Sequence, residues 1–94
     1  MIPNSITVQV TAEDIAEGTP SSFSACPIAL AVSRLFENRT VRVTGGSIRV
    51  YADTGRDVLA TYDVPWTAHR FINSFDNGEE VQPLTFNTLR YLEY

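Results

Sequence analysis

Residues 41–50 read VRVTGGSIRV, and they set the strand arrangement that we expect for the whole chain. Valine and isoleucine alternate with arginine on both sides of Gly45-Gly46, which is typical of two half-buried strands joined by a tight turn. A two-residue turn at the glycines makes Arg42 face Arg49 across the hairpin. The stretch therefore predicts an antiparallel hairpin with one apolar face and one face that carries two arginines.

The remaining elements are expected on either side of this hairpin. Apolar and polar residues alternate in the expected strands, and apolar residues recur at helical spacing in the expected helices. Pro27 and Pro65 suit helix starts, and Asn77-Gly78 suits a helix end. In chain order, the expected elements are a strand at 6–10, a short helical turn at 12–17, a helix at 27–37, strands at 41–43, 48–50 and 58–62, a helix from Pro65 to Asn77-Gly78, and a strand at 84–86.

This order predicts one α+β domain over residues 1–94, with a small antiparallel sheet packed against two helices. A length of 94 residues suits a single hydrophobic core, and 44% hydrophobic residues exclude global disorder. Phe23, in the loop before the first helix, is expected to be tucked inward. Residues 88–94 fit a helix, a strand or an arm that docks on a partner.

The sequence gives no sign of a membrane or of secretion. It has no run of 18 apolar residues, and it does not start with a basic segment followed by an apolar block. Its single cysteine leaves no internal disulfide framework. We therefore expect a cytoplasmic protein with no membrane contact.

The charge balance argues against nucleic acid as a partner. Seven arginines and no lysine stand against eleven acidic residues, which gives a net charge of −4. Nucleic-acid binding draws most of its affinity from neutralised phosphates, so a basic excess is expected for it. The absence of lysine also excludes a Walker loop or a lysine Schiff base.

Groups suited to catalysis are few. His69 is the single histidine and is expected at the surface. The sequence has no nucleophile-elbow motif that would supply the serine of a Ser-His-Asp site. His69 and Cys26 are too few for a zinc site, and we expect neither a metal nor a cofactor. Cys26 precedes the proline of the first helix, so it is either a reactive thiol activated by the helix start or a small buried packing residue. An enzyme built on Cys26 and His69 requires the two side chains to be adjacent.

The arginine pair is the most informative feature. Like charges directly opposite each other on two strands are mildly unfavourable. A phosphate or carboxylate of a partner could lie between Arg42 and Arg49 and compensate them. The structural alternative is a carboxylate of the same chain, Asp63 or Glu80, or side chains that splay into solvent.

Other residues are candidates for the same contact surface or for a second one. Arg39 and Tyr51 would extend the arginine patch. Trp66, Tyr91 and Tyr94 are of the types enriched at interaction hot spots, and the two tyrosines lie at the chain end. They would either close the core or bind a partner, including a second copy in a homodimer.

Several blocks carry a resemblance to a known group of sequences: TAEDIAEG at 11–18, CPIALAV at 26–32, FINSFDNGE at 71–79 and PLTF at 83–86. Together they resemble small uncharacterised proteins of bacteriophages and some bacteria. That group often has a second cysteine just before the one that matches Cys26, whereas this chain has none. The resemblance implies a cytosolic, viral origin and carries over no functional residue.

These observations favour a non-enzymatic protein-interaction module. The specific expectation is a phage accessory protein that binds and inhibits or modulates a host protein. The alternative is a small-anion or nucleotide-binding domain that uses Arg42 and Arg49.

Overall fold

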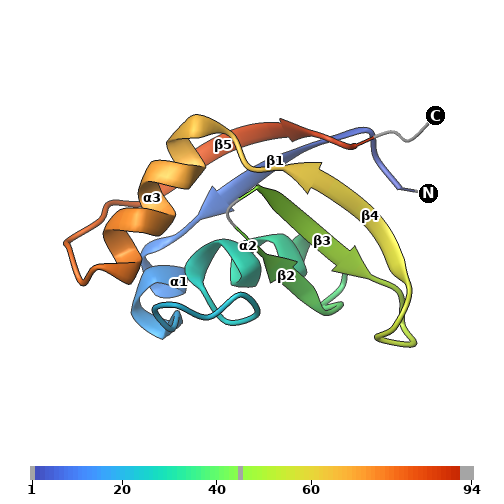
Figure 1. The fold of residues 1–94 in the computed structure, drawn as a ribbon, viewed down its shortest axis with the longest axis horizontal. Helices are drawn as coiled ribbons and strands as arrows, with labels where there is room; N and C mark the ends of the chain where they lie inside the picture. The colour runs from blue at the N-terminus through green and yellow to red at the C-terminus, as the bar shows by residue number, and fades with distance from the viewer. Residues whose placement is uncertain (1, 45, 92–94) are drawn as a thin grey trace.

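The computed structural model describes residues 2–44 and 46–91, and it confirms the α+β class (Figure 1). Each predicted element is present, and the expected turn at 12–17 forms a helix of its own. The elements in chain order are β1 (Ser5–Val10), α1 (Ala12–Glu17), α2 (Pro27–Leu35), β2 (Val41–Val43), β3 (Ser47–Tyr51), β4 (Val58–Asp63), α3 (Trp66–Asp76) and β5 (Leu84–Leu89).

The hairpin of residues 41–50 forms in the predicted register. β2, β3 and β4 make a three-stranded antiparallel sheet in which Arg42 lies opposite Arg49. The backbone N–H of Thr44 donates to the carbonyl of Ser47 at 2.9 Å, which closes the hairpin at its tip. Gly45 of the predicted turn lies outside the described residues.

The strands form two sheets rather than the single sheet that we predicted. β1 and β5 pair antiparallel as a separate two-stranded sheet, and an isolated bridge between Tyr62 and Arg90 joins it to β4. Next to this bridge, the hydroxyl of Thr88 donates to the carbonyl of Asp63 at 2.6 Å. A side chain thus takes a carbonyl that a continuous ladder would pair with a backbone N–H, so the two sheets are joined at an isolated bridge and not along a ladder.

Helix α2 packs against both sheets and supplies the centre of the core. It contacts β1 on one side and β2 on the other, and Figure 1 shows it between these two strands. The alternating strand residues predicted to be apolar face it. The largest fully buried side chains are Tyr62, Ile28, Ile48, Val8, Val10, Val32, Val50 and Pro27.

Local sequence fixes where the first two helices begin. Thr11 caps α1, and its side chain and that of Asp14 exchange hydrogen bonds with each other's backbone N–H groups, which is a capping box. Cys26 caps α2, with Pro27 as its first residue. Gly18 ends α1 so close to α2 that a Cβ at this position would lie 2.6 Å from Cδ of Pro27.

The structure tests two predictions, one on the side chain of Phe23 and one on the conformation of the tail. The prediction that Phe23 is tucked inward is wrong, because its side chain is 57% exposed. Its carbonyl instead accepts a hydrogen bond from Val43 N–H at 2.6 Å, so this loop covers the outer edge of β2 with its backbone. In the tail, β5 continues to Leu89, which favours the strand alternative up to that residue.

Within residues 2–44 and 46–91, no helix is long and apolar enough to cross a membrane.

Candidate functional site

The arginine pair lies on the outer face of the three-stranded sheet. Arg42 and Arg49 are both exposed, while their strand neighbours Val41, Val43 and Val50 are buried on the opposite face. We call this outer surface the arginine face and define it by Arg42, Ser47, Arg49, Tyr51 and Thr61. The two-residue periodicity of the strands places these side chains together, since alternate residues point to the same side of a sheet.

Two aromatic rings lie next to the guanidinium group of Arg42. The Cζ atom of Arg42 lies 5.7 Å from the ring centroid of Phe23 and 5.6 Å from that of Tyr51. Both distances fall within cation–π range. Tyr51 was predicted to extend the patch, and the structure places it there. Phe23 was missed, because the sequence indicates its apolar character and not the loop path that brings it beside β2.

Two carboxylates of the described residues pair with arginines other than Arg42 and Arg49. Arg34 bonds to Asp14 at 2.9 Å, and Nε of Arg39 bonds to Asp53 at 3.1 Å. Across residues 2–44 and 46–91, no ion pair involves Arg42 or Arg49.

The two carboxylates considered in the sequence as partners do not supply one. Asp63 lies opposite Ser47, two residue pairs away from Arg49 on the same face of the sheet, and neither Asp63 nor Glu80 forms an ion pair in the described structure. Arg39 is predicted to extend the arginine patch as a free positive charge, whereas in the structure it forms an ion pair. Its guanidinium is engaged by Asp53 at the β3–β4 turn.

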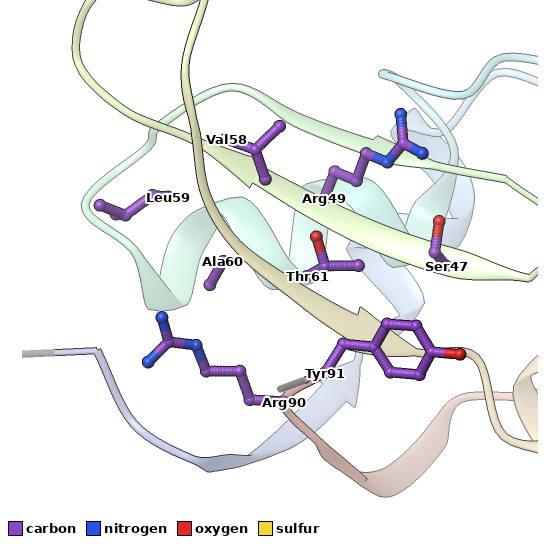
Figure 2. A pocket seen from close by; sticks show the side chains of 8 residues that line it. All are labelled: Ser47, Arg49, Val58, Leu59, Ala60, Thr61, Arg90 and Tyr91. Carbon is purple, nitrogen blue, oxygen red and sulfur yellow. The ribbon is translucent and has the colours of Figure 1, made fainter. Parts of the chain in front are cut away.

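An open groove of about 640 Å³ adjoins the arginine face. Its lining includes Arg49 and Thr61 from the sheet and Arg90 and Tyr91 from the chain that follows β5. The N–H of Tyr91 donates to the carbonyl of Thr61 at 2.7 Å, which ties this segment to β4. Figure 2 shows the side chains of Arg49 and Arg90 on either side of β4. Arg90 was missed in the sequence because its position depends on this long-range contact.

Cys26 occupies the helix start as predicted, but its thiol is buried. Only 5% of the residue is exposed, and its Sγ accepts a hydrogen bond from Ala29 N–H at 3.4 Å. Burial raises the pKa of the Cys26 thiol, and the backbone N–H groups of the helix start oppose this shift only in part. The packing interpretation of Cys26 therefore fits the structure better than an activated thiol.

The aromatic candidates lie at separate places. Trp66, at the start of α3, is 70% exposed and stacks on His69 with 6.2 Å between ring centroids. Tyr91 is exposed and lines the groove beside Arg49. Tyr94 lies outside the described residues. Of these residues, Tyr91 is the one that the structure brings to the arginine face.

The described residues offer no evident metal centre. Within residues 2–44 and 46–91, no group of three or more His, Cys, Asp or Glu side chains converges in a way that could hold a metal ion. The carboxyl of Asp14 has a shifted pKa. Its pKa is lowered mainly by the hydrogen bonds from Arg34, against an opposing effect of burial. This pair joins α1 to α2 and is structural.

Comparisons with protein-family models, with curated proteins and with solved structures find no match for this chain. The resemblance to phage proteins stays a prediction, and the function is argued from the geometry of the arginine face.

Proposed function

We propose that this protein is a non-enzymatic binding module that contacts an acidic surface of another protein through its arginine face. One observation carries the proposal. Arg42 and Arg49 lie directly opposite each other, and among the described residues no carboxylate neutralises either of them. In a chain of net charge −4, two such arginines on one face require an explanation.

The chemistry of the pair favours a carboxylate-bearing partner. Two like charges on facing strand positions repel each other, and the repulsion is relieved when an anion lies between them. Arginine binds carboxylates through a planar fork of N–H groups, often with two parallel hydrogen bonds. An Asp or Glu side chain of a partner placed between Arg42 and Arg49 would bond to both.

The aromatic rings support a contact with a protein surface. Phe23 and Tyr51 restrain the guanidinium of Arg42 before any partner arrives, which lowers the entropy lost on binding. Arginine and tyrosine are among the residue types that dominate binding energy in protein interfaces. The exposed ring of Phe23 adds apolar area next to the charges. The resemblance to phage proteins adds the proposal that the partner is a protein of the host cytoplasm.

The test is site-specific cross-linking in bacterial cells. A photo-activated amino acid replaces Ser47 on the arginine face, and in a second strain it replaces Glu17, which ends α1. We expect one protein to be cross-linked from position 47 and not from position 17. The adduct should be lost when Arg42→Gln and Arg49→Gln are added.

The matched control carries Arg56→Gln and Arg70→Gln, which remove the same charge from two other exposed positions. It should keep the adduct. An adduct at position 47 that survives the loss of Arg42 and Arg49, or the absence of any adduct there, would contradict the proposal.

A second candidate function is the binding of a small anion or nucleotide in the groove beside β4. The groove carries Arg49, Arg90 and the hydroxyl of Thr61. However, the two arginines lie on either side of β4 in Figure 2, which suits an extended partner better than one small anion. Thermal unfolding in inorganic phosphate and in ATP, at constant ionic strength, separates the two functions. A ligand at 100 times its Kd adds about 2.7 kcal/mol, so a bound nucleotide would raise the Tm of the wild type and not of Arg49→Gln.

A further inference from the structure

The backbone of β1 has one paired side and one open side. The N–H of Arg90 donates to the carbonyl of Asn4, and this pair continues the β1–β5 register. In an antiparallel ladder the hydrogen-bonded pairs recur every second residue, so the even-numbered residues of β1 bond to β5. The N–H and C=O groups of Ser5, Thr7 and Gln9 therefore point away from β5. We call this row of groups the β1 edge.

The β1 edge is almost free of partners within the described structure. Among residues 2–44 and 46–91, one hydrogen bond reaches it, from Nη2 of Arg34 to the carbonyl of Gln9 at 3.2 Å. That carbonyl keeps a second lone pair. The backbone groups of Ser5 and Thr7 have no hydrogen-bond partner in this part of the chain, while the side-chain hydroxyl of Thr7 donates to Oδ1 of Asn87 in β5 at 2.6 Å.

The neighbouring positions close the β1 edge at both ends. Pro3 has no N–H to donate, and its carbonyl accepts the hydroxyl of Tyr62 at 2.6 Å. Thr11 donates its N–H to Asp14, and its carbonyl accepts from the N–H of Ile15. The open window thus runs from Ser5 to Gln9, and Thr7 is at its centre.

The surroundings of the β1 edge leave room for another strand. A groove of about 240 Å³ runs beside it, lined by Thr7 and Gln9 on one side and by Ala31, Arg34 and Leu35 of α2 on the other. Leu35 is an apolar residue that remains 49% exposed there. Neither β1 nor β5 contains a charged residue or a proline, the features with which proteins commonly block a sheet edge.

We infer that the β1 edge pairs antiparallel with the β1 edge of a second copy, about a two-fold axis at Thr7. This register places Thr7 opposite its own counterpart and Ser5 opposite Gln9. It satisfies every open group of the window on both copies and leaves the already bonded Pro3 and Thr11 outside. A two-fold contact needs a surface that complements itself, and a window symmetric about one residue meets this condition.

The side chains of the same register are also compatible. On the outer face, the β-branched Thr7 meets Thr7 of the second copy, a pairing that favours sheets. On the inner face, Ile6 meets Val8, and the strand of the second copy covers the exposed part of Leu35. No like charges face each other, because Ser5–Val10 carries none. The inference is independent of the proposed function, since the arginine face belongs to the other sheet.

Molar mass across a protein concentration series, measured by light scattering, tests the inference. We expect the wild type to approach twice 10.4 kDa as the concentration rises. Thr7→Lys places two like charges at the two-fold axis and should stay at 10.4 kDa. Thr85→Lys is the matched control, because Thr85 is an exposed residue of β5 outside the window, and it should dimerise like the wild type.

The decisive arm is a mixture of Thr7→Lys with Thr7→Glu. Each variant alone should be monomeric, and the mixture should form a heterodimer because opposite charges then meet at the axis. This arm restores dimerisation, so a folding defect cannot produce it. A wild type that stays monomeric, as it would if the β1 edge served a strand of another protein, overturns the inference. So does a Thr7→Lys variant that dimerises like the wild type.

Discussion

The two sheets of this protein carry different kinds of contact surface. β1 and β5 contain no charged residue, whereas β2, β3 and β4 contain Arg42, Arg49 and Asp63. Within residues 2–44 and 46–91, the two-stranded sheet has backbone groups without a hydrogen-bond partner along one edge, and the three-stranded sheet has two arginines on one face. A backbone edge binds any strand of suitable register, while an arginine pair selects for negative charge. Under the two proposals, this small domain would bind two partners that do not compete.

The largest effect on stability is expected from a substitution at Tyr62, which lies where β4 meets the two-stranded sheet. Tyr62 is fully buried in β4, forms the bridge to Arg90, and donates its hydroxyl to Pro3 at 2.6 Å. Tyr62→Ala should lower the free energy of unfolding by about 3–5 kcal/mol, as large-to-small changes of buried aromatics do. Chemical denaturation measures this loss.

Tyr62→Phe separates the ring from its hydroxyl. It should lower the free energy of unfolding by about 1 kcal/mol, because only the hydrogen bond to Pro3 is removed. Tyr51→Phe, on the arginine face, is the matched control, since no hydrogen bond of the described residues uses the Tyr51 hydroxyl. Equal losses for the two Phe variants would show that the bond to Pro3 does not stabilise the junction.

A substitution at Gly18 should weaken both regions together. A Cβ there would lie 2.6 Å from Cδ and Cγ of Pro27 and 2.9 Å from the carbonyl of Asp14. Gly18→Ala must displace the start of α2, on which both sheets pack, and we expect a loss of about 1–3 kcal/mol. Amide hydrogen exchange should rise in β1 and in β3 alike. Faster exchange in β1 alone would contradict the role of α2 as a shared support.

Acid should weaken the ion pair between Asp14 and Arg34, which joins α1 to α2. Hydrogen bonds from Arg34 lower the pKa of Asp14 below its ordinary value of 3.8. A carboxylate with a lowered folded-state pKa stabilises the fold above its unfolded pKa, and the stabilisation is lost as the pH falls through the folded pKa. Stability should therefore fall with acidification below about pH 4.

Asp14→Asn checks this pH dependence. The variant loses the ion pair with Arg34 and should be less stable at neutral pH by about 1 kcal/mol, in the range of a lost helix cap. Below pH 4 its free energy of unfolding should change less with pH than that of the wild type. Parallel pH curves for the two proteins would contradict the assignment to Asp14. Asp53→Asn, at the exposed ion pair with Arg39, is the control and should change little.

The sequence predicts local structure well and long-range contacts poorly. The hairpin register follows from Gly45-Gly46 and the alternation beside it, so the Arg42–Arg49 pair was predicted correctly. The helix starts at Pro27 and the end at Asn77-Gly78 also follow from local rules. The pairing of β1 with β5 and the single bridge to β4 depend on contacts between residues far apart in the sequence. Local patterns do not encode these contacts, so the sequence predicts one sheet where the structure has two.

The same distinction applies to the candidate site. Two arginines of the face are predicted from strand periodicity. Phe23 reaches the face through a loop path, and Arg90 reaches the adjoining groove through a bridge, and no local pattern encodes either contact. The engagement of Arg39 by Asp53 was missed for the same reason. The β1 edge could not be foreseen, because an edge exists only once the partner strand of β1 is known.

Arg42 and Arg49 face each other, and within residues 2–44 and 46–91 no ion pair neutralises either of them, so we expect the two side chains to repel each other. A double-mutant cycle with Arg42→Gln, Arg49→Gln and the double variant measures this interaction without any partner. Arg49→Gln alone should raise the free energy of unfolding by about 0.2–1 kcal/mol, while Arg42→Gln also loses its ring contacts. Because either change relieves the same repulsion, the double variant should be less stable than the sum of the single effects predicts.

The coupling energy between Arg42 and Arg49 should become smaller as salt is added, since salt screens the interaction between exposed charges. A coupling energy of zero, or a double variant more stable than that sum, would show that the repulsion between Arg42 and Arg49 is compensated within the chain.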